Sequence, residues 1–418
     1  MDRFRKLEEL KPHIDKCVLC AGCHAGCPTY NQSRMEHDSA RGKVLLAGAL
    51  LKGEIEPDKK LMEKFEHCLT CMNCREVCPA GAEPVKVINA ARSEIFTRTN
   101  SNNTARFIFK KILPDKKLLS LFAKGMALGT RLFKLMPSIS ALPFVKDGKK
   151  RIFPNFSFGK LKKSFPEIIS PLQGKPVLRV AYFTGCMAET TYHDTGRAVI
   201  ELLQSAGVEV HLFRDEVCCS APAYFAGDHE TSGKMADANI ELFTSREIDY
   251  IVTSCATCGS VLKEIYPEIA SHSKKAEFSE KIIDYQKLII EKLPGKIPFK
   301  KDGPPIRVTY HDPCHLNRGM NVKNEPRELL KKLPGVEFVE MDNAGSCCGG
   351  AGSFALKFYG DSIDIGRNKG ESIKRSGAEM VITACPSCRM QLKDLTSRYA
   401  PGVEVTDTAV LLRKLLKK

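Results

Sequence analysis

The stretch VLRVAYFTGC at residues 177–186 returns as PIRVTYHDPC at residues 305–314, and two further blocks repeat at the same spacing of about 129 residues. The second pair is ELLQSAGVEVHLFRDEVCC at 201–219 and ELLKKLPGVEFVEMDNAGSCC at 328–348; the third is REIDYIVTSCATC at 246–258 and SGAEMVITACPSC at 376–388. Each unit holds three short apolar runs rich in β-branched residues, separated by helical stretches, which indicates strands of a largely parallel sheet. The second half of the chain is therefore predicted to be a duplicated α/β fold.

Each repeated unit carries five cysteines in the same order. The first unit has Cys186, Cys218, Cys219, Cys255 and Cys258, and the second has Cys314, Cys347, Cys348, Cys385 and Cys388. The single cysteine and the C-x-x-C pair follow expected strand ends, where open α/β sheets gather ligands. Adjacent Cα atoms lie about 3.8 Å apart, too close for an unstrained disulfide, and five thiolates exceed the four that zinc takes. The CC pair therefore predicts a cluster more open than a cube, beside which Gly349 and Gly350 allow close backbone approach and N–H donation to sulfur.

Two runs with the spacing C-x2-C-x2-C-x3-C-P occupy the first hundred residues, CVLCAGCHAGCP at 17–28 and CLTCMNCREVCP at 68–79. This spacing resembles that of bacterial two-cluster ferredoxins, in which the fourth cysteine of each run ligates the other cluster. The resemblance implies one cubane 4Fe–4S cluster on Cys17, Cys20, Cys23 and Cys78, and a second on Cys68, Cys71, Cys74 and Cys27. Apolar residues between and after the runs have helical spacing, at 39–55 and 84–96. A helical two-cluster domain is expected, not a small β-rich ferredoxin.

Other interpretations of these two runs explain less. The CAGCH stretch at 20–24 has the form of a haem attachment site, but its cysteines belong to a complete run and the second run has no matching histidine. Zinc ribbons use two separated C-x-x-C pairs, not eight cysteines in two identical runs. His24 and His67 beside the runs are expected to pack against or shield a cluster.

The amino-acid composition indicates that the cysteine thiols bind metal. Eighteen cysteines in 418 residues are many for a chain without an export signal, and the N-terminal residues 1–17 are charged throughout. No stretch of about 18 uncharged apolar residues is present, so no membrane-spanning helix is expected. We therefore expect a cytoplasmic protein whose cysteines stay reduced and serve as ligands.

The net charge of +15 is concentrated in residues 104–151, which hold twelve Lys or Arg against two acids, a net +10. Within this segment Lys117, Lys124 and Arg131 recur every seven residues on one face of an expected helix. Leu118, Phe122, Met126 and Leu132 lie near the other face. Such a helix fits a membrane interface, on the inner face of the membrane, or packing on the ferredoxin domain or a partner. No nucleic-acid motif accompanies the charge, so no nucleic-acid partner is expected.

No nucleotide site is expected in this chain. GDHETSGK at 227–234 departs from the phosphate loop, because five residues separate its glycines and Met235 follows the lysine. No G-x-G-x-x-G follows a strand, so flavin or nicotinamide chemistry must come from another chain. In HDPCH, His311 or His315 is a candidate proton donor beside a cluster, and helix capping and packing explain these histidines equally well.

The C…CCG…C-x-x-C units resemble the CCG-domain iron–sulfur proteins. In heterodisulfide reductases of that family five cysteines bind a noncubane 4Fe–4S cluster, a role that would fall on the second unit's five. An N-terminal dicluster domain followed by two CCG units resembles the iron–sulfur subunits of glycolate oxidase and of anaerobic glycerol-3-phosphate dehydrogenase. Ser220 stands where the family motif has glycine, so whether the first unit holds the same cluster as the second stays open. In either unit, structural zinc and redox-active thiols are the alternatives to a cluster.

These resemblances imply an α+β multidomain protein with four segments. They are a dicluster domain (1–103), a basic linker (104–174), a first CCG unit (175–300) and a second CCG unit (301–418). Two cubane clusters and one or two further clusters are expected. The implied function is electron transfer from an FAD-containing partner subunit, which oxidises a 2-hydroxyacid such as glycolate or D-lactate, to quinone or another acceptor. The alternatives are disulfide reduction at a noncubane cluster, glycerol-3-phosphate oxidation in the complex, and a carrier with structural metal.

Overall fold

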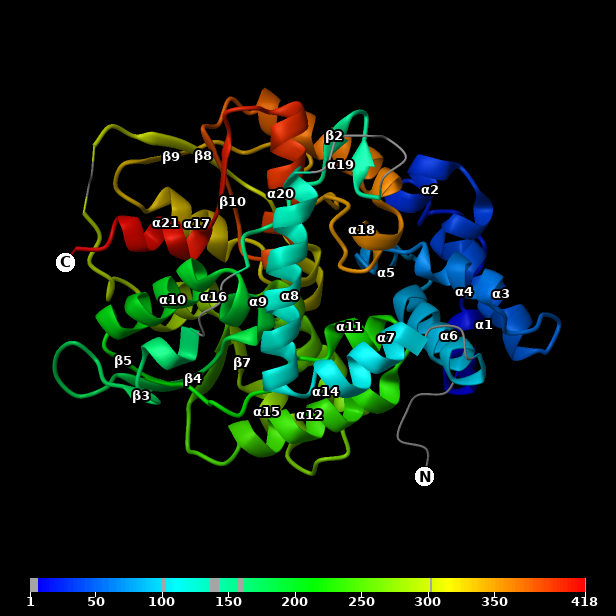
Figure 1. The fold of residues 1–418 in the computed structure, drawn as a ribbon, viewed down its shortest axis with the longest axis horizontal. Coiled ribbons are helices and arrows are strands. Elements are labelled where there is room, and N and C mark those ends of the chain that lie inside the picture. The colour runs from blue at the N-terminus through cyan, green and yellow to red at the C-terminus, as the bar shows by residue number, and fades with distance from the viewer. Residues whose placement is uncertain (1–6, 100–102, 136–142, 157–160, 301–302, 418) are drawn as a thin grey trace.

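The computed structural model describes residues 7–99, 103–135, 143–156, 161–300 and 303–417 (Figure 1). A helical N-terminal domain, blue in Figure 1, lies beside two α/β units coloured green and yellow to red. The expected α+β multidomain architecture is confirmed.

Short helices build the N-terminal domain around two cysteine loops. They are η1 (Leu7–Leu10), α1 (Lys11–Asp15), α2 (Pro28–Ser33), η2 (Glu36–Asp38), α3 (Ala40–Leu51), α4 (Lys59–Glu66), α5 (Asn73–Glu76) and α6 (Pro84–Arg98). The Ser39 hydroxyl caps α3 by accepting a hydrogen bond from the Gly42 N–H at 2.9 Å. Helices α3 and α6 bury Val44, Ala47 and Ala91 against each other. The two helices expected between and after the cysteine runs are therefore confirmed.

The first α/β unit has a five-stranded sheet in the order β3-β5-β4-β6-β7, parallel except for β3. Its strands are β3 (Ile168–Ile169), β4 (Leu178–Phe183), β5 (Val208–His211), β6 (Tyr250–Thr253) and β7 (Ile282–Asp284). Its helices are α9 (Gly185–Thr190), α10 (His193–Ser205), α11 (Ala221–Phe225), α12 (His229–Phe243), α13 (Ala256–Ser260), η5 (Val261–Ile265), α14 (Tyr266–Ile269), α15 (Lys275–Glu280) and α16 (Tyr285–Lys292).

The second unit repeats this arrangement with the sheet order β11-β10-β8-β9, all parallel. Its strands are β8 (Ile306–Tyr310), β9 (Val336–Phe338), β10 (Met380–Thr383) and β11 (Glu404–Asp407). Its helices are η6 (His315–Gly319), α17 (Glu325–Lys331), α18 (Phe354–Lys357), α19 (Tyr359–Arg375), α20 (Pro386–Tyr399) and α21 (Thr408–Lys414). Across the sheet the order is β5-β4-β6-β7 in the first unit and β9-β8-β10-β11 in the second. The four shared strands therefore have the same order in both units, and the duplication predicted from sequence extends to the sheet topology.

The two units interlock through helices and through their cysteine-bearing edges. Helix α10 packs on α21, and α16 packs on α17. At the junction the Ala256 N–H donates to the Ala384 carbonyl oxygen at 3.3 Å, just beyond β6 and β10. The carboxyl ends of these two strands therefore meet, and each carries a C-x-x-C pair to the same place.

The basic segment forms α7 (Asn103–Phe107), η3 (Ile108–Ile112), α8 (Lys116–Leu135), the hairpin β1 (Val145–Lys146) and β2 (Lys149–Lys150), and η4 (Leu161–Ser164). In Figure 1 helix α8 crosses in front of both α/β units. Within the described residues no helix is both long and apolar enough to traverse a bilayer.

Candidate functional site

The two N-terminal cysteine loops have the same strained backbone conformation. Leu19 and Thr70, each two residues after the first cysteine of a run, have φ of 56° and 49°. Ala21 and Met72, each directly after the second cysteine, have φ of 62° and 61°. Left-handed backbone costs about 1–2 kcal/mol at each such residue and persists where the surroundings demand it. The turns also aim an amide at sulfur, since the Thr70 N–H donates to Cys68 Sγ at 3.4 Å.

The cysteines of the two runs approach each other. Burial raises the pKa of the Cys74 thiol, and neighbouring thiolate charges raise it further. Those neighbours are Cys71, Cys68, Cys27 and Cys23. On the other side, a Cβ placed on Gly22 would lie 3.9 Å from the Val77 carbonyl oxygen, next to Cys78. This crossing agrees with the exchanged fourth ligand implied by the ferredoxin resemblance, and the ligand sets themselves stay a prediction.

The second unit draws its five thiols into one group. The Cys347 thiol hydrogen-bonds Cys314 and the Cys388 thiol hydrogen-bonds Cys348, which lowers the pKa of both acceptors. The Gly349 N–H donates to Cys347 Sγ at 3.4 Å, as its place in the CCG stretch predicted. Cys385 immediately precedes α20 and completes the set.

His311 adds an imidazole to this group. One of its ring nitrogens lies within 4.8 Å of the Sγ atoms of Cys348 and Cys388. The side chain is fully buried, and its hydrogen bond with Cys348 helps to lower the pKa of that thiol. At the matching position of the first unit stands Phe183. The two thiol groups therefore differ by a buried imidazole, which the HDPCH stretch had marked as a candidate.

The first unit gathers its own five thiols despite Ser220. The Cys218 thiol and then that of Cys258 hydrogen-bond Cys219 and lower its pKa to about 6. Hydrogen bonding with Cys218 raises the pKa of Cys186. Ser220 takes the left-handed backbone that Gly349 has in the second unit, with φ of 66° against 81°. The serine therefore preserves the turn of the CCG motif.

Neighbouring thiols connect the second N-terminal run, the second unit and the first unit. Across the unit junction the Cys255 thiol hydrogen-bonds Cys385 and lowers its pKa well below the usual value, an effect to which Cys388 adds. At the other side, burial raises the pKa of Cys71 and the thiolate charge of Cys314 raises it further. The structure thus brings the second N-terminal run against the second unit, and the second unit against the first. None of the eighteen cysteines is in a disulfide.

Comparison with known proteins identifies this arrangement. The cysteine-rich CCG domain matches residues 180–263 and 308–393, and the 4Fe–4S dicluster domain matches residues 13–82. A probable glycolate oxidase iron–sulfur subunit of Bacillus subtilis is 30% identical over 408 residues, which cover 92% of this chain and 90% of that protein. The chain belongs to the CCG-domain iron–sulfur protein family.

Two further relatives carry different names. The glycolate oxidase iron–sulfur subunit of Escherichia coli is 26% identical, and the alignment covers 90% of this chain and 89% of that one. A subunit of the dihydromethanophenazine:CoB–CoM heterodisulfide reductase of Methanosarcina acetivorans is 25% identical, with 96% and 94% covered. The family resemblance stated from sequence is confirmed, and with it iron–sulfur electron transfer.

The donor atoms suit several 4Fe–4S clusters. Thiolates are the ligands of such clusters, and the free thiols lie in groups with backbone N–H donors turned toward sulfur at Cys68 and Cys347. Bound clusters supply one-electron transfer. The protein supplies thiolates, burial and amide hydrogen bonds, which are the factors that set cluster potentials.

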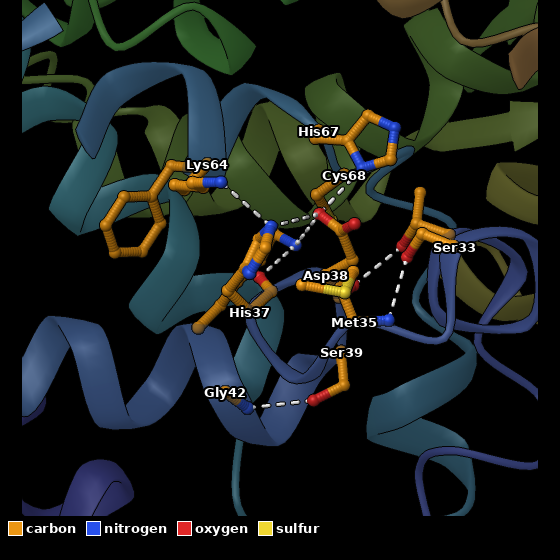
Figure 2. A network of polar contacts seen from close by, with 12 residues as sticks. Ser33, Met35, His37, Asp38, Ser39, Gly42, Lys64, His67 and Cys68 are labelled. Atoms are coloured by element: carbon orange, nitrogen blue, oxygen red, sulfur yellow. Dashed lines mark hydrogen bonds and ion pairs between the residues drawn. The ribbon is translucent and has the colours of Figure 1, made fainter. Parts of the chain in front are cut away.

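The imidazole of His67, largely buried beside Cys68, ties the N-terminal domain to the second unit. His67 donates from Nδ1 to Asp38 Oδ1 at 2.8 Å and from Nε2 to Asp361 Oδ2, on α19, at 3.0 Å. Figure 2 shows Asp38 meeting His67 beside Cys68, with His37 and Lys64 close by. Burial disfavours the charged imidazole, but its hydrogen bonds with Asp361 and Asp38 outweigh that effect and raise the pKa of His67 to about 9. His67, which the sequence indicated as a packing or shielding residue, is a charged bridge between domains.

We expect Asp361→Asn to weaken this bridge in a pH-dependent way. The pKa of His67 is about 9 in the folded protein, above the value of about 6.5 for a free histidine. The bridge therefore contributes its full stability below about pH 6.5 and loses it as the pH rises through about 9. The free energy of unfolding of wild type should exceed that of the variant by about 1 kcal/mol at pH 6.5, a modest value because Asp361 is partly exposed. This difference should vanish near pH 10.

The measurement is anaerobic denaturant unfolding across that pH range. Asp364→Asn is the matched control, because Asp364 lies one turn further along α19 and pairs with Lys146 at 3.1 Å. Lysine ammonium groups stay protonated at pH 9. A difference for Asp361→Asn that stays constant with pH, as for the control, would show that His67 carries no charge in the bridge.

Proposed function

We propose that this chain is the iron–sulfur electron-transfer subunit of a flavin-dependent 2-hydroxyacid oxidase or dehydrogenase, with glycolate or D-lactate as the substrate class. The observation that carries the proposal is the direct contact of the second cysteine loop with the second CCG unit. His315 hydrogen-bonds the Thr70 carbonyl oxygen at 3.1 Å, Arg318 donates to the Cys71 carbonyl oxygen at 3.5 Å, and the charge of Cys314 helps to raise the pKa of the Cys71 thiol. The names of two relatives as glycolate oxidase subunits support the substrate class.

The ligand sets belong to this proposal. Two cubane clusters are assigned to Cys17, Cys20, Cys23 and Cys78, and to Cys68, Cys71, Cys74 and Cys27. The ten CCG cysteines are assigned to two further clusters, one on the second unit's five and one on the first unit's five. The left-handed turn kept by Ser220 supports a cluster in the first unit.

The first cysteine run is the proposed place of electron entry. Cys20 is exposed, and the neighbouring Val18 and Leu19 expose 68% and 46% of their surface. Apolar side chains beside a solvent-facing ligand suit contact with an FAD-containing partner subunit, since short distances between cofactors favour electron transfer. Electrons would then pass inward toward Cys71 and the CCG units, and on to quinone or another acceptor.

Anaerobic affinity purification of the full chain from its native cells tests the proposal. A flavoprotein should accompany the chain in equal amount, and glycolate, D-lactate and glycerol 3-phosphate should then be compared as its substrates. Val18→Asp should release the flavoprotein, whereas Leu172→Asp, at a side chain that is 65% exposed on the first unit, should retain it. A preparation without iron, or with a cytochrome b partner and no flavin, would overturn the proposal.

Disulfide reduction by the second unit is the other candidate function. His311 favours it, because reduction of a disulfide to two thiols consumes two electrons and two protons, and this imidazole lies beside Cys348 and Cys388. The relative named as part of a heterodisulfide reductase supports the same candidate. Turnover of a disulfide by the purified chain with an artificial electron donor, lost in His311→Phe, would establish it over the conducting role.

A further inference from the structure

Helix α8 presents its leucines to solvent and its small residues to the protein. Ala123, Ala127 and Thr130 are buried, at 6%, 4% and 8% exposure. About half a turn round the helix axis, Leu121, Leu128 and Leu132 expose 65%, 60% and 56% of their surface. Leu118 continues this line one turn earlier. We call these four side chains the leucine ridge.

Basic residues run along one flank of the leucine ridge. Lys117, Lys124 and Arg131 are exposed and recur every seven residues, so they lie within about 40° of one another around the helix. The sequence of α8 contains no acidic residue. Asp115, just before it, is occupied as the N-cap and accepts hydrogen bonds from the Lys117 and Leu118 N–H groups at 2.7 and 2.9 Å. The outer face of α8 is therefore apolar along its centre and positive along one side.

We propose that α8 lies in the interface of an anionic lipid bilayer, with the leucine ridge in the acyl boundary and the basic flank at the headgroups. Charge complementarity favours a lipid surface over a protein partner on this face of α8. Lysine is depleted at protein–protein interfaces, whereas lysine and arginine beside an apolar stripe are typical of helices that bind membrane surfaces. Long basic side chains can also cover apolar surface while their charges reach headgroups. The leucine ridge faces away from the protein and is open to such contact.

This inference goes beyond the proposed electron transfer and does not depend on it. A bilayer contact at α8 would hold the CCG units at the surface from which a membrane quinone is reached. Loss of lipid binding would leave a flavoprotein partner untouched, and loss of that partner would leave lipid binding untouched. The two proposals therefore fail separately.

Co-sedimentation of the iron-loaded full chain with vesicles tests the inference. The chain should bind vesicles of phosphatidylcholine with about one third phosphatidylglycerol, and bind pure phosphatidylcholine far more weakly. Lys117→Gln with Lys124→Gln and Arg131→Gln should weaken binding to the anionic vesicles by roughly 100-fold, about 5-fold per charge. Leu121→Gln with Leu128→Gln should weaken binding to them by roughly ten-fold or more.

The matched control is Leu172→Gln with Val177→Gln, which removes two exposed apolar side chains, 65% and 48% exposed, from the first unit. It should bind vesicles as wild type does. All the variants change exposed side chains, and circular dichroism with iron content verifies their fold. Absence of vesicle binding by wild type, or equal loss in the α8 and control variants, would overturn the inference. Binding that requires the flavoprotein would overturn it too, because α8 would then contact protein.

Discussion

Gly349→Ala is expected to lower the free energy of unfolding by about 2–5 kcal/mol and to release the iron of the second CCG unit. Gly349 has φ of 81°, and a Cβ at this position would lie 2.3 Å from the backbone carbonyl oxygen of Ser362 on α19. Left-handed strain costs about 1–2 kcal/mol and the clash adds about 1–3 kcal/mol. The oxygen belongs to a helix backbone, so it cannot turn away. The measurements are anaerobic denaturant unfolding and iron per chain.

Gly53→Ala separates strain from crowding. Gly53 also has a left-handed backbone, with φ of 73°, but a Cβ there would meet nothing within 4 Å. Its substitution should therefore cost about 1 kcal/mol and leave the iron content unchanged. Equal destabilisation by the two substitutions would show that contact with Ser362 does not matter.

Ser220 is the natural counterpart in the first unit. Its hydroxyl hydrogen-bonds that of Ser232 on α12 at 2.6 Å, so the side chain has a place and a partner. Ser220→Gly relieves backbone strain but loses this buried hydrogen bond, and the two effects are each about 1 kcal/mol. We expect a net change within about 1 kcal/mol. The same motif position thus tolerates a side chain in one unit and excludes it in the other.

Pairs of cysteine substitutions should reveal the exchanged ligands of the dicluster domain through iron content. If Cys78 shares a cluster with Cys17, then Cys17→Ser with Cys78→Ser should lose about four iron atoms per chain, no more than either single variant. Cys74→Ser with Cys78→Ser should lose about eight, because those two cysteines would then serve different clusters.

The contrary result is equally clear. If each run held its own cluster with all four of its cysteines, the Cys17 and Cys78 pair would lose about eight iron atoms and the Cys74 and Cys78 pair about four. Iron and acid-labile sulfide per chain are the measurements. The iron of the CCG units serves as an internal reference, because none of these cysteines belongs to the repeated half.

Local sequence was enough to predict most strands of the repeats, and to place cysteines after several of those strands. The six strands expected in the repeats are present, because β-branched apolar runs bounded by turns carry their own signal. Strands β7 and β11 were missed, and so were the two-residue strands β1, β2 and β3. Strands β7 and β11 are three and four residues long, and each is an edge strand that pairs with a single neighbour. They are strands because of that pairing with another segment, which their own few residues do not reveal. A basic amphipathic helix was predicted where α8 lies, but not which face of it would be buried.

The sequence by itself determined the family, the duplicated α/β fold and the thiol groups within each unit, since repeats and ligand spacings are properties of contiguous residues. Only the tertiary structure decided how the groups join. The approach of Cys255 to Cys385, the bridge from His67 to Asp361 and the outward leucine ridge of α8 connect or expose residues through the packing of separate segments. The physical reason is that burial, charge pairing and thiol proximity depend on which surfaces meet, and spacing along the chain carries no record of that.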